Sequence, residues 1–316
     1  MVIDTNYEWE DIFMLLEDLQ KEFMFHAQSQ GYTSRTLKNY KGNSIRFIAY
    51  LENEFQITEL DEVKPMHVKQ YGVTLHQKGR KETYINGIYK VLRSFFNYCV
   101  HEGYILEKHN PCLKVKWFKE EMPIIETFTP EEVRKLINAY GSSTYLEARN
   151  KLIMIMLFET GVRNLELCHM MKMNVGETAI KIIGKGKKER QLPISPILNK
   201  HLIKYNRIRE QYLRDDFRGH DNLFLSQNGK PLTVEAVERI VKIAGERANI
   251  TREIRISPHT CRHTFAQMML MNGIDVYSLS RLLGHNDISI TRRYLQSLND
   301  SDIVENSIKF SPLMNL

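Results

Sequence analysis

Several side chains in the last sixty residues could act together on a phosphate group. His259 and Arg262 lie three residues apart. Tyr294 comes nine residues after His285, and Arg163 lies far upstream of all four. An arginine donates to two phosphate oxygens at once, and preorganised cations usually supply the largest share of a rate acceleration. The set therefore indicates a phenol oxygen that attacks a phosphodiester whose charge is neutralised by two arginines.

A lysine-rich turn provides a candidate for the remaining task, which is to give a proton to the departing oxygen. Lys185 lies in the turn of residues 184–188, between two predicted strands, where its side chain can reach into a groove. Lys187 and Lys188 lie close by and stay open as alternatives on position alone. We expect Lys185 to be the general acid of the set.

No metal ion or cofactor is expected at this site. The sequence offers no acidic cage beside the candidate residues, so the arginines would take the place of metal ions. His259 and His263 are four residues apart, as in a helical zinc pair. The glutamate of the HExxH motif is missing and no third ligand is evident. We therefore expect His263 to form a hydrogen bond within the protein core.

The elements that must position these residues are predicted to be helices around one small sheet. Residues 129–132 have the pattern of a helix start, with an N-cap threonine and a proline at the first position. Residues 178–183 and 189–194 are typical of two strands. Further helices are expected to begin at Thr233, Ser257 and Asp275, and the last to run from Asp287 or Ser289 through Tyr294.

The first hundred residues are predicted to form a helical bundle, because their apolar residues recur at helical spacing. One apolar stripe runs over residues 9–23, and Ser34 is expected to cap a second helix. A third helix follows Pro65, and a fourth carries the stripe over residues 85–99.

Cations on the outer faces of these helices, and on one helix further along, are candidates for contact with nucleic-acid phosphates. A single surface cation is more often merely solvated. As a group they could hold the phosphate backbone without reading its sequence. The candidates are Arg35, Lys38, Lys41, Lys81, Lys90, Arg93, Arg239 and Lys242.

Length and composition favour a soluble protein of two domains. Of the 316 residues, 42% are hydrophobic and 26% are charged. The net charge of +6 and the pI near 8.9 lean weakly toward a polyanionic partner. We expect a helical domain over residues 1–106, a linker over 107–128, and a second domain over 129–316 that ends in a tail, residues 299–316.

Cysteine spacing and apolar runs favour a cytoplasmic location. The cysteines show no CxxC spacing, so neither a zinc ribbon nor a disulfide framework is indicated, and reduced thiols are expected. The first residues lack the apolar stretch of a signal peptide. The longest apolar run, residues 152–158, is too short to span a bilayer. The cysteines are Cys99, Cys112, Cys168 and Cys261, of which the last is interpreted as a packing residue beside Arg262.

The order and wording of these motifs resemble the tyrosine recombinase (phage integrase) family. The resemblance covers the whole second domain. Within the family, the chain resembles Xer-like or mobile-element recombinases. Two stretches of the first domain, residues 36–40 and 93–98, also resemble the family's core-binding helical domain. In the second domain the matching pieces are residues 160–167, 184–190, 259–266, 282–285 and 291–294.

This resemblance implies a mainly α (α+β) fold. The first domain would be a helical SAM-like core-binding domain that clamps DNA. The second would be a mostly helical catalytic domain with a small antiparallel β-sheet. By the same resemblance Tyr294 attacks the scissile phosphate and holds the 3′ end as a phosphotyrosine, which frees a 5′ hydroxyl.

The resemblance also implies a role for each remaining candidate. Arg163 and Arg262 would hold the phosphate oxygens, and Lys185 would serve as general acid. His259 and His285 would position protons and oxygens. Behind this first set, Glu166 would orient an arginine or a histidine, and His263 would support the site.

The implied partner is double-stranded DNA with inverted-repeat recombination sites. Four protomers would exchange strands between two duplexes through a Holliday junction, without ATP, and an accessory recombination factor could take part. The apolar tail could fold back on its own domain or be exchanged with a neighbouring protomer.

Two alternatives stay open on the sequence. A type IB topoisomerase-like enzyme would share the chemistry but would nick and close DNA without exchanging partners. A non-catalytic DNA-binding regulator on the same scaffold would lack a member of the catalytic set, and every member is present in the sequence.

Overall fold

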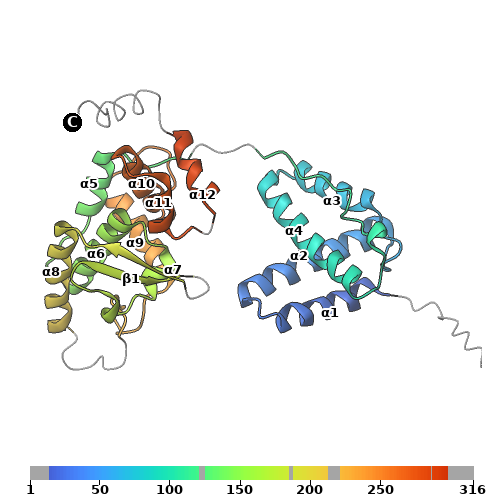
Figure 1. Ribbon diagram of the computed structural model, residues 1–316, viewed down its shortest axis with the longest axis horizontal. Coiled ribbons are helices and arrows are strands. Elements are labelled where there is room, and N and C mark those ends of the chain that lie inside the picture. The colour runs from blue at the N-terminus through green and yellow to red at the C-terminus, as the bar shows by residue number, and fades with distance from the viewer. Residues whose placement is uncertain (1–13, 121–124, 185–187, 213–220, 286, 298–316) are drawn as a thin grey trace, which may run out of the picture. The chain divides into compact units, whose positions relative to one another are not determined.

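The computed structural model describes residues 14–120, 125–184, 188–212, 221–285 and 287–297. The chain divides into two compact units, Met1–Met122 and Pro123–Leu316 (Figure 1). Within the described ranges, none of the helices combines the length and the apolarity that crossing a bilayer would require. Each unit has its own buried core.

Helices form the first unit because each has one apolar face that packs against its neighbours. Helix α1 packs on α2, and α4 packs on α1, α2 and α3. Large aromatic side chains fill the centre, including Phe47, Phe95 and Phe96, each at most 1% exposed. The elements are α1 (Leu16–Ser29), α2 (Ser34–Phe55), α3 (Pro65–Gln77), α4 (Glu82–His101) and the short 3₁₀ helix η1 (Glu107–His109).

Two details of the first unit differ from the sequence expectation. The N-cap of α2 is Thr33 rather than Ser34, because the Thr33 hydroxyl accepts a hydrogen bond from the Thr36 amide. Both residues can cap a helix, and the path of the chain places Thr33 just outside the first turn. The first helix begins at Leu16, and residues 9–13 of the predicted stripe lie outside the described residues.

Much of the predicted linker packs on one unit or the other instead of connecting them freely. Cys112 and Val115 are buried in the core of the first unit. Asn86 on α4 bonds both the amide and the carbonyl of Phe118, at 2.9 Å each. At the other end, Phe128 belongs to the core of the second unit. Residues 107–120 are thus held on the first unit by side chain to backbone hydrogen bonds and by buried side chains, without a long regular helix.

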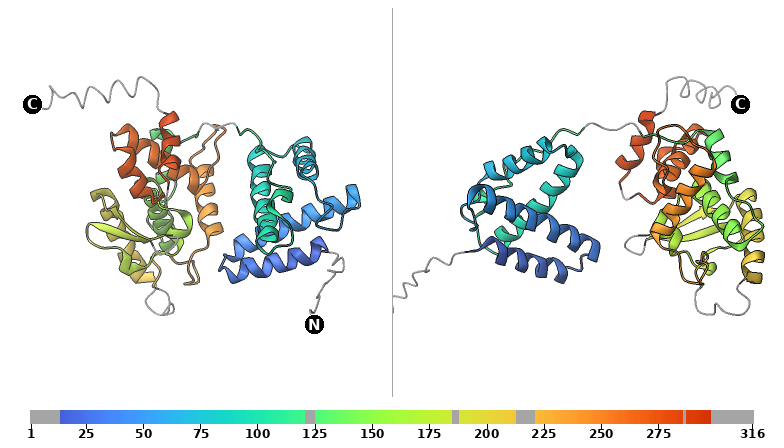
Figure 2. Two further views of the ribbon diagram at one scale, coloured as in Figure 1. Left: turned by 45° about the vertical axis from the view of Figure 1, so that its right-hand side comes forward. Right: turned by 180° about the vertical axis from the view of Figure 1, so that it is seen from behind.

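The second unit is built around one helix, α6, which is buried along nearly its whole length. It packs against α8 on one side and against α10 on another. Helices α8 and α12 lie on opposite sides of the unit (Figures 1 and 2). The helices are α5 (Pro130–Asn138), α6 (Tyr145–Thr160), α7 (Asn164–Cys168), η2 (Lys172–Asn174), α8 (Pro196–Tyr212), α9 (Val234–Arg247), α10 (Pro258–Met271), α11 (Val276–Leu283), α12 (Ser289–Arg292) and η4 (Arg293–Ser297).

The predicted pair of strands is confirmed as a two-stranded antiparallel sheet of β1 (Ala179–Ile183) and β2 (Glu189–Pro193). Ile182 faces Arg190 across the ladder, and Ile180 faces Leu192. The three apolar residues of these pairs are buried, so the alternation places the Arg190 side chain on the inward face.

The helix starts and stops of the second unit follow the sequence signals closely. Thr129 caps α5 in a capping box, Ser257 caps α10 and Asp275 caps α11, each by a side-chain oxygen that accepts from a backbone amide. Gly284 ends α11 with φ 65°, a left-handed conformation that glycine adopts without steric cost. The end of the last stretch differs from the expectation, because Tyr294 lies in the 3₁₀ helix η4 that follows α12.

Candidate active site

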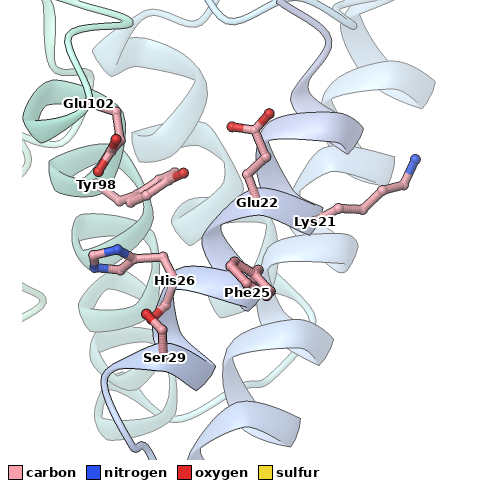
Figure 3. Close-up of a pocket in the computed structure, with 7 residues that line it drawn as sticks. All are labelled: Lys21, Glu22, Phe25, His26, Ser29, Tyr98 and Glu102. Carbon is pink, nitrogen blue, oxygen red and sulfur yellow. The ribbon is translucent and has the colours of Figure 1, made fainter.

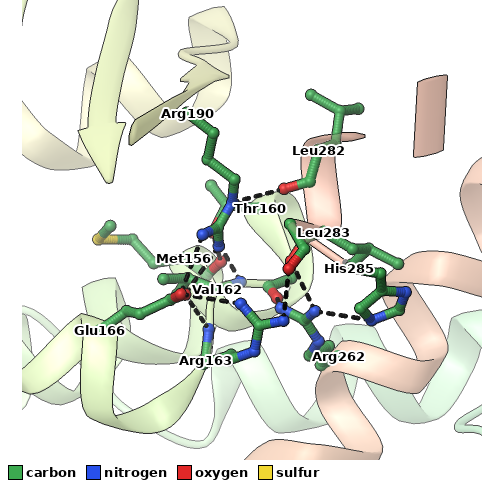
Figure 4. Close-up of polar contacts among 12 residues, drawn as sticks. Met156, Thr160, Val162, Arg163, Glu166, Arg190, Arg262, Leu282, Leu283 and His285 are labelled. Carbon is green, nitrogen blue, oxygen red and sulfur yellow. Dashed lines mark hydrogen bonds and ion pairs between the residues drawn. The ribbon is translucent and has the colours of Figure 1, made fainter. Parts of the chain in front are cut away.

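Residues from distant parts of the second unit converge where α6 and α11 end. Arg163 precedes α7, Arg190 lies on β2, Arg262 lies on α10 and His285 follows α11. Figure 4 shows Arg163 and Arg190 directed at Glu166, and Arg262 directed at Leu283 and His285 beside them. The sequence had placed Arg163, Arg262 and His285 in one site. Arg262 contacts His285 directly, and Arg163 bonds the carbonyl of Gly284, the residue before His285.

Arg262 is held by the ends of two helices. Its Nη1 donates to the carbonyl of Gly161 at 2.6 Å, and its Nη2 donates to the carbonyl of Leu283 at 2.7 Å. Carbonyls at helix C-termini have no partner within the helix and carry partial negative charge. Burial lowers the pKa of Arg262 to about 10, with a contribution from Arg163, so the guanidinium stays charged at neutral pH.

Arg163 is the more accessible of the two candidate phosphate-binding arginines. Its side chain is 39% exposed, whereas Arg262 is only 3% exposed. Its Nη1 donates to Glu166 at 2.9 Å and its Nη2 donates to the carbonyl of Gly284 at 2.7 Å. Arg163 is therefore fixed at two points and still keeps surface that a substrate could meet.

Glu166 and Arg190 form a buried ion pair behind these arginines. Both side chains are at most 10% exposed, and the two nitrogens of Arg190 donate to the two carboxylate oxygens at 2.7 and 2.9 Å. Burial by itself would raise the pKa of Glu166, but the hydrogen bond and charge of Arg190, together with Arg163, lower it overall. The sequence led us to expect that Glu166 orients one arginine. In the structure its carboxylate bonds two, Arg163 and Arg190.

Sequence reasoning gave Arg190 no role, although the residue lies within a matching motif. The missed signal was its position: an arginine on the inward face of a half-buried strand needs a carboxylate partner. Arg190 also donates from Nε to the carbonyl of Leu282 at 2.8 Å. A side chain at Gly284 would come within 3.0 Å of the Arg190 guanidinium, so the glycine there permits this close approach.

His285 is fixed through both ring nitrogens. Its Nε2 lies 3.0 Å from Nη2 of Arg262, and its Nδ1 lies 2.8 Å from the Thr291 hydroxyl. An arginine only donates, so Nε2 accepts and Nδ1 carries the proton. Burial, followed by the charges of Arg262 and Arg163, lowers the pKa of His285 to about 4. The ring is therefore neutral at neutral pH.

Tyr294 is buried in a small apolar cluster that also belongs to the second unit. It is 2% exposed, and the cluster also contains Phe265, Leu279 and Leu283. Its hydroxyl lies 2.8 Å from Nδ1 of His263. Burial raises the pKa of Tyr294, while the charges of Arg262, Arg293 and Arg163 act in the opposite direction. The arginines are thus close enough to influence the phenol electrostatically.

The hydrogen bond that the sequence interpretation expected of His263 is made to the buried hydroxyl of Tyr294, the candidate nucleophile. His263 is half-buried on α10. The ring of His259, which keeps an exposed surface, lies 4.8 Å from it in an edge-to-face arrangement. Partial desolvation and the charge of Arg262 lower the pKa of His259. The four-residue spacing of His259 and His263, which resembled a zinc pair, could have indicated the contact between their two rings.

Other predicted residues fall in different places. Lys185 and Lys187 lie outside the described residues, and Lys188 is exposed. Within the described ranges, no cluster of His, Cys, Asp or Glu could hold a metal ion. The predicted tail, residues 299–316, is outside the described residues, and all the cysteines are buried free thiols.

The candidate DNA-contacting cations are exposed, with one exception. Arg93 is half-buried, donates to the carbonyl of Val115 at 2.6 Å, and lies 4.1 Å above the ring of Trp117. Its guanidinium is therefore committed to contacts within the first unit. The exposed ones are Arg35, Lys38, Lys41, Lys81, Lys90, Arg239 and Lys242.

A surface pocket of about 520 Å³ lies in the first unit, on α1 and the end of α4 (Figure 3). Exposed Phe25 and the rings of His26 and Tyr98 line it together with Glu22 and Glu102. None of the residues that line it belongs to the catalytic set.

The comparison with protein families agrees with this geometry. The phage integrase family matches residues 126–300, and the family's N-terminal SAM-like domain matches residues 21–103. A tyrosine recombinase XerD from Listeria monocytogenes is 30% identical over 282 residues, which cover 88% of this chain and 94% of that protein. A tyrosine recombinase XerC from Thermodesulfovibrio yellowstonii is 32% identical over 278 residues, covering 86% and 89%.

Solved structures share the fold. The XerH site-specific recombinase bound to its palindromic difH substrate superimposes with a TM-score of 0.72 at 19% identity, over 92% of this chain and 84% of that one. A lambda integrase dimer bound to a core site gives a TM-score of 0.71 at 18% identity, over 91% and 97%. With its arginine, histidine and tyrosine residues gathered in the matched region, the chain belongs to the phage integrase family and is a tyrosine recombinase, an enzyme of site-specific DNA recombination.

Proposed function

We propose that the second unit cleaves a DNA strand with Tyr294, holds the 3′ phosphate covalently on that side chain, and then joins it to a new 5′ hydroxyl. The observation that carries this proposal is the convergence of Arg163 and Arg262, nearly a hundred residues apart in sequence, beside a buried phenol. Because the phosphotyrosine conserves the energy of the cleaved bond, rejoining needs no ATP.

The two arginines are proposed to bind the non-bridging oxygens of the scissile phosphate. Arginine carries five N–H donors. The contacts of Arg262 with Gly161, Leu283 and His285 involve three of them, so donors are left for phosphate oxygens. Holding the guanidinium by fixed carbonyls removes the need to reorganise it during the reaction, which is what makes electrostatic stabilisation effective.

The charge balance of the site suits a phosphodiester that gains negative charge. Glu166 pairs with Arg163 and Arg190, and Arg262 bonds the carbonyl of Leu283, next to the Gly284 carbonyl that Arg163 bonds. Three arginines and one glutamate leave two positive charges. His285 stays neutral beside them, because burial and the arginines lower its pKa. An arriving phosphate would therefore meet uncompensated cations, without a metal ion to assist them.

Lys185 is proposed to protonate the departing 5′ oxygen. Lys185 itself lies outside the described residues, and the residues that flank the gap are joined by a hydrogen bond from the backbone amide of Gly184 to the carbonyl of Lys188 at 2.8 Å. We propose further that His285 and His259 position oxygens and protons at the phosphate. The Thr291 hydroxyl and Arg262 fix the ring of His285 for this task.

The proposed substrate is double-stranded DNA with inverted-repeat sites, bound in part by the exposed cations of both units. We propose that four protomers act on two duplexes through a Holliday junction, and that they do so in the cytoplasm. Residues 299–316 are proposed to be exchanged between neighbouring protomers. An accessory factor is proposed to regulate the reaction. The fold that the chain shares with a lambda integrase tetramer bound to a Holliday junction supports this assembly.

A nicked suicide DNA duplex from the protein's own genomic neighbourhood tests the proposal. Cleavage frees a short DNA fragment that begins with the 5′ hydroxyl. Once this fragment diffuses away, rejoining is prevented, so the covalent adduct accumulates and can be quantified on a denaturing gel. The wild-type chain should form the adduct, and Tyr294→Phe should bind the DNA without forming it. Tyr277→Phe, at a tyrosine that is 63% exposed on α11, is the matched control and should form it normally.

An adduct with Tyr294→Phe would contradict the proposed nucleophile. Two differently labelled duplexes then separate recombination from topoisomerase-like closure. A recombinase transfers strands between them, whereas an enzyme that only nicks and closes relaxes supercoils and leaves the labels apart.

A further inference from the structure

We propose that His263 is a catalytic residue that accepts the hydroxyl proton of Tyr294 during cleavage and returns it during rejoining. This inference rests on the proposed function of Tyr294. It gives the nucleophile a base of its own, separate from the residues that bind the phosphate and from the lysine that protonates the leaving oxygen.

The geometry places a proton acceptor at the phenol. Nδ1 of His263 lies 2.8 Å from the Tyr294 hydroxyl, within the range required of a general base. The two rings lie 5.5 Å apart between centroids and are tilted by 57°. The apolar cluster packs around the ring of Tyr294, and His263 contacts its hydroxyl.

Burial makes this acceptor necessary. Tyr294 is 2% exposed, so bulk water has little access to its hydroxyl. A phenol that attacks phosphorus must nevertheless lose its proton. His263, in hydrogen-bond contact with the hydroxyl, is a group to which that proton can pass directly.

The charged surroundings keep His263 ready to accept. It is faced by His259 and Arg262 on α10 and by Arg293 and Tyr294 on η4. Burial, followed by His259 and the two arginines, lowers the pKa of His263 to about 4, so the ring is neutral at neutral pH. A neutral ring with its proton on Nε2 offers Nδ1 to the phenol.

The step balances as follows. A bond forms between Oη of Tyr294 and phosphorus, and the bond from phosphorus to the 5′ oxygen breaks. The phenol proton moves to Nδ1 of His263, and the 5′ oxygen takes a proton from the general acid. In rejoining, the imidazolium of His263 returns its proton to the departing phenol.

The same surroundings couple this transfer to substrate binding. A protonated His263 would stand beside Arg262 and Arg293, and the repulsion disfavours it while the site is empty. A bound phosphate adds negative charge among these cations and makes the protonated ring less costly. Bound DNA therefore favours transfer of the proton from Tyr294 to His263.

Single-turnover cleavage of the suicide duplex tests the inference, with DNA binding measured in parallel. His263→Ala and His263→Asn should each slow adduct formation by about 10²-fold or more, in the range of general base catalysis. Asparagine can place an acceptor oxygen near the position of Nδ1 but cannot carry a proton away. His201→Asn, at a half-buried histidine on α8, is the matched control and should cleave at the wild-type rate.

A substrate with sulfur in place of the scissile 5′ oxygen identifies which proton is at stake. A thiolate leaves without protonation because thiols are far more acidic than alcohols. This substrate should rescue Lys185→Ala and should not rescue the His263 variants. The cleavage rate of the variants should instead rise with pH, as the phenol ionises without help.

The possible outcomes separate the two proposals. If Tyr294→Phe forms the adduct, the proposed function fails. If Tyr294 is required but both His263 variants cleave within about threefold of the wild-type rate, or if sulfur substitution or asparagine restores that rate, the base role is overturned and the function stands. Should both variants lose DNA binding, nitrogen NMR of the wild-type histidines decides: a proton on Nδ1 of His263 in the DNA-free chain overturns the inference, and a proton on Nε2 supports it.

Discussion

Most candidate DNA-contacting cations of the first unit lie on exposed helix faces, as Lys38, Lys41 and Lys90 do. The arginines of the active site are instead held in place by protein partners. Arg262 is 3% exposed and bonds two helix ends, and Arg190 is paired with Glu166 through two hydrogen bonds. Exposed charges are screened and act mainly by their number. Buried charges act by their position, because the low local dielectric strengthens each interaction.

The largest effect is expected from removing the most buried cation of the site. Arg262→Ala should slow single-turnover cleavage by about 10³-fold, because it removes preorganised donors from the phosphate. Arg262→Lys should not restore the rate, since an ammonium cannot reproduce the planar fork. Arg207→Ala, at an exposed arginine on α8 outside the set of candidate DNA contacts, is the control. Cleavage by Arg262→Ala within tenfold of the wild-type rate would contradict the comparison.

An intermediate effect is expected from breaking the buried ion pair. Arg190→Ala leaves the carboxylate of Glu166 buried with Arg163 as its remaining arginine, and should lower the free energy of unfolding by roughly 3 kcal/mol. Adding Glu166→Gln should recover part of this loss, because the amide carries no charge. Chemical denaturation measures both variants.

The matched control for that pair is Arg252→Ala. Arg252 bonds Glu132 at 2.9 Å, but its side chain is 43% exposed. Its loss should cost less than about 1 kcal/mol, as for exposed ion pairs. Equal losses for Arg190→Ala and Arg252→Ala would show that burial does not distinguish the two pairs.

The smallest effect is expected from a single exposed lysine of the first unit. Lys38→Ala should weaken DNA binding only a few-fold and reduce the slope of log affinity against log salt concentration by about 1. Cleavage at saturating protein should stay unchanged, because the chemistry takes place in the second unit. Titrations at several salt concentrations measure both quantities, and an unchanged slope would remove Lys38 from the DNA contact.

Local signals in the sequence were sufficient for much of the fold. Thr129, Ser257 and Asp275 cap their helices as predicted, and the two strands appear where alternating residues placed them. These features depend on neighbours within a few residues, such as a side-chain oxygen and the amide three residues on. Where two neighbours could both act, as at Thr33 and Ser34, the sequence did not decide.

Contacts between distant segments were harder to predict. The linker prediction over residues 107–128 missed that Cys112 and Val115 are buried in the first unit, because neither has a periodic context. Arg190 had no predicted role, since its partner Glu166 lies 24 residues away. A pairing of this kind depends on how α7 and β2 pack, which no local pattern reports.

The sequence by itself determined the family, the helical character of both units and the set of side chains able to act on a phosphate. Those properties follow from residue types, their order and their short-range spacing. Only the tertiary structure decided which side chains touch: that the ends of α6 and α11 hold Arg262, that Arg190 shares Glu166 with Arg163, and that His263 meets Tyr294. The physical reason is that hydrogen bonds depend on distances of about 3 Å in space, and chain folding alone brings such distant residues that close.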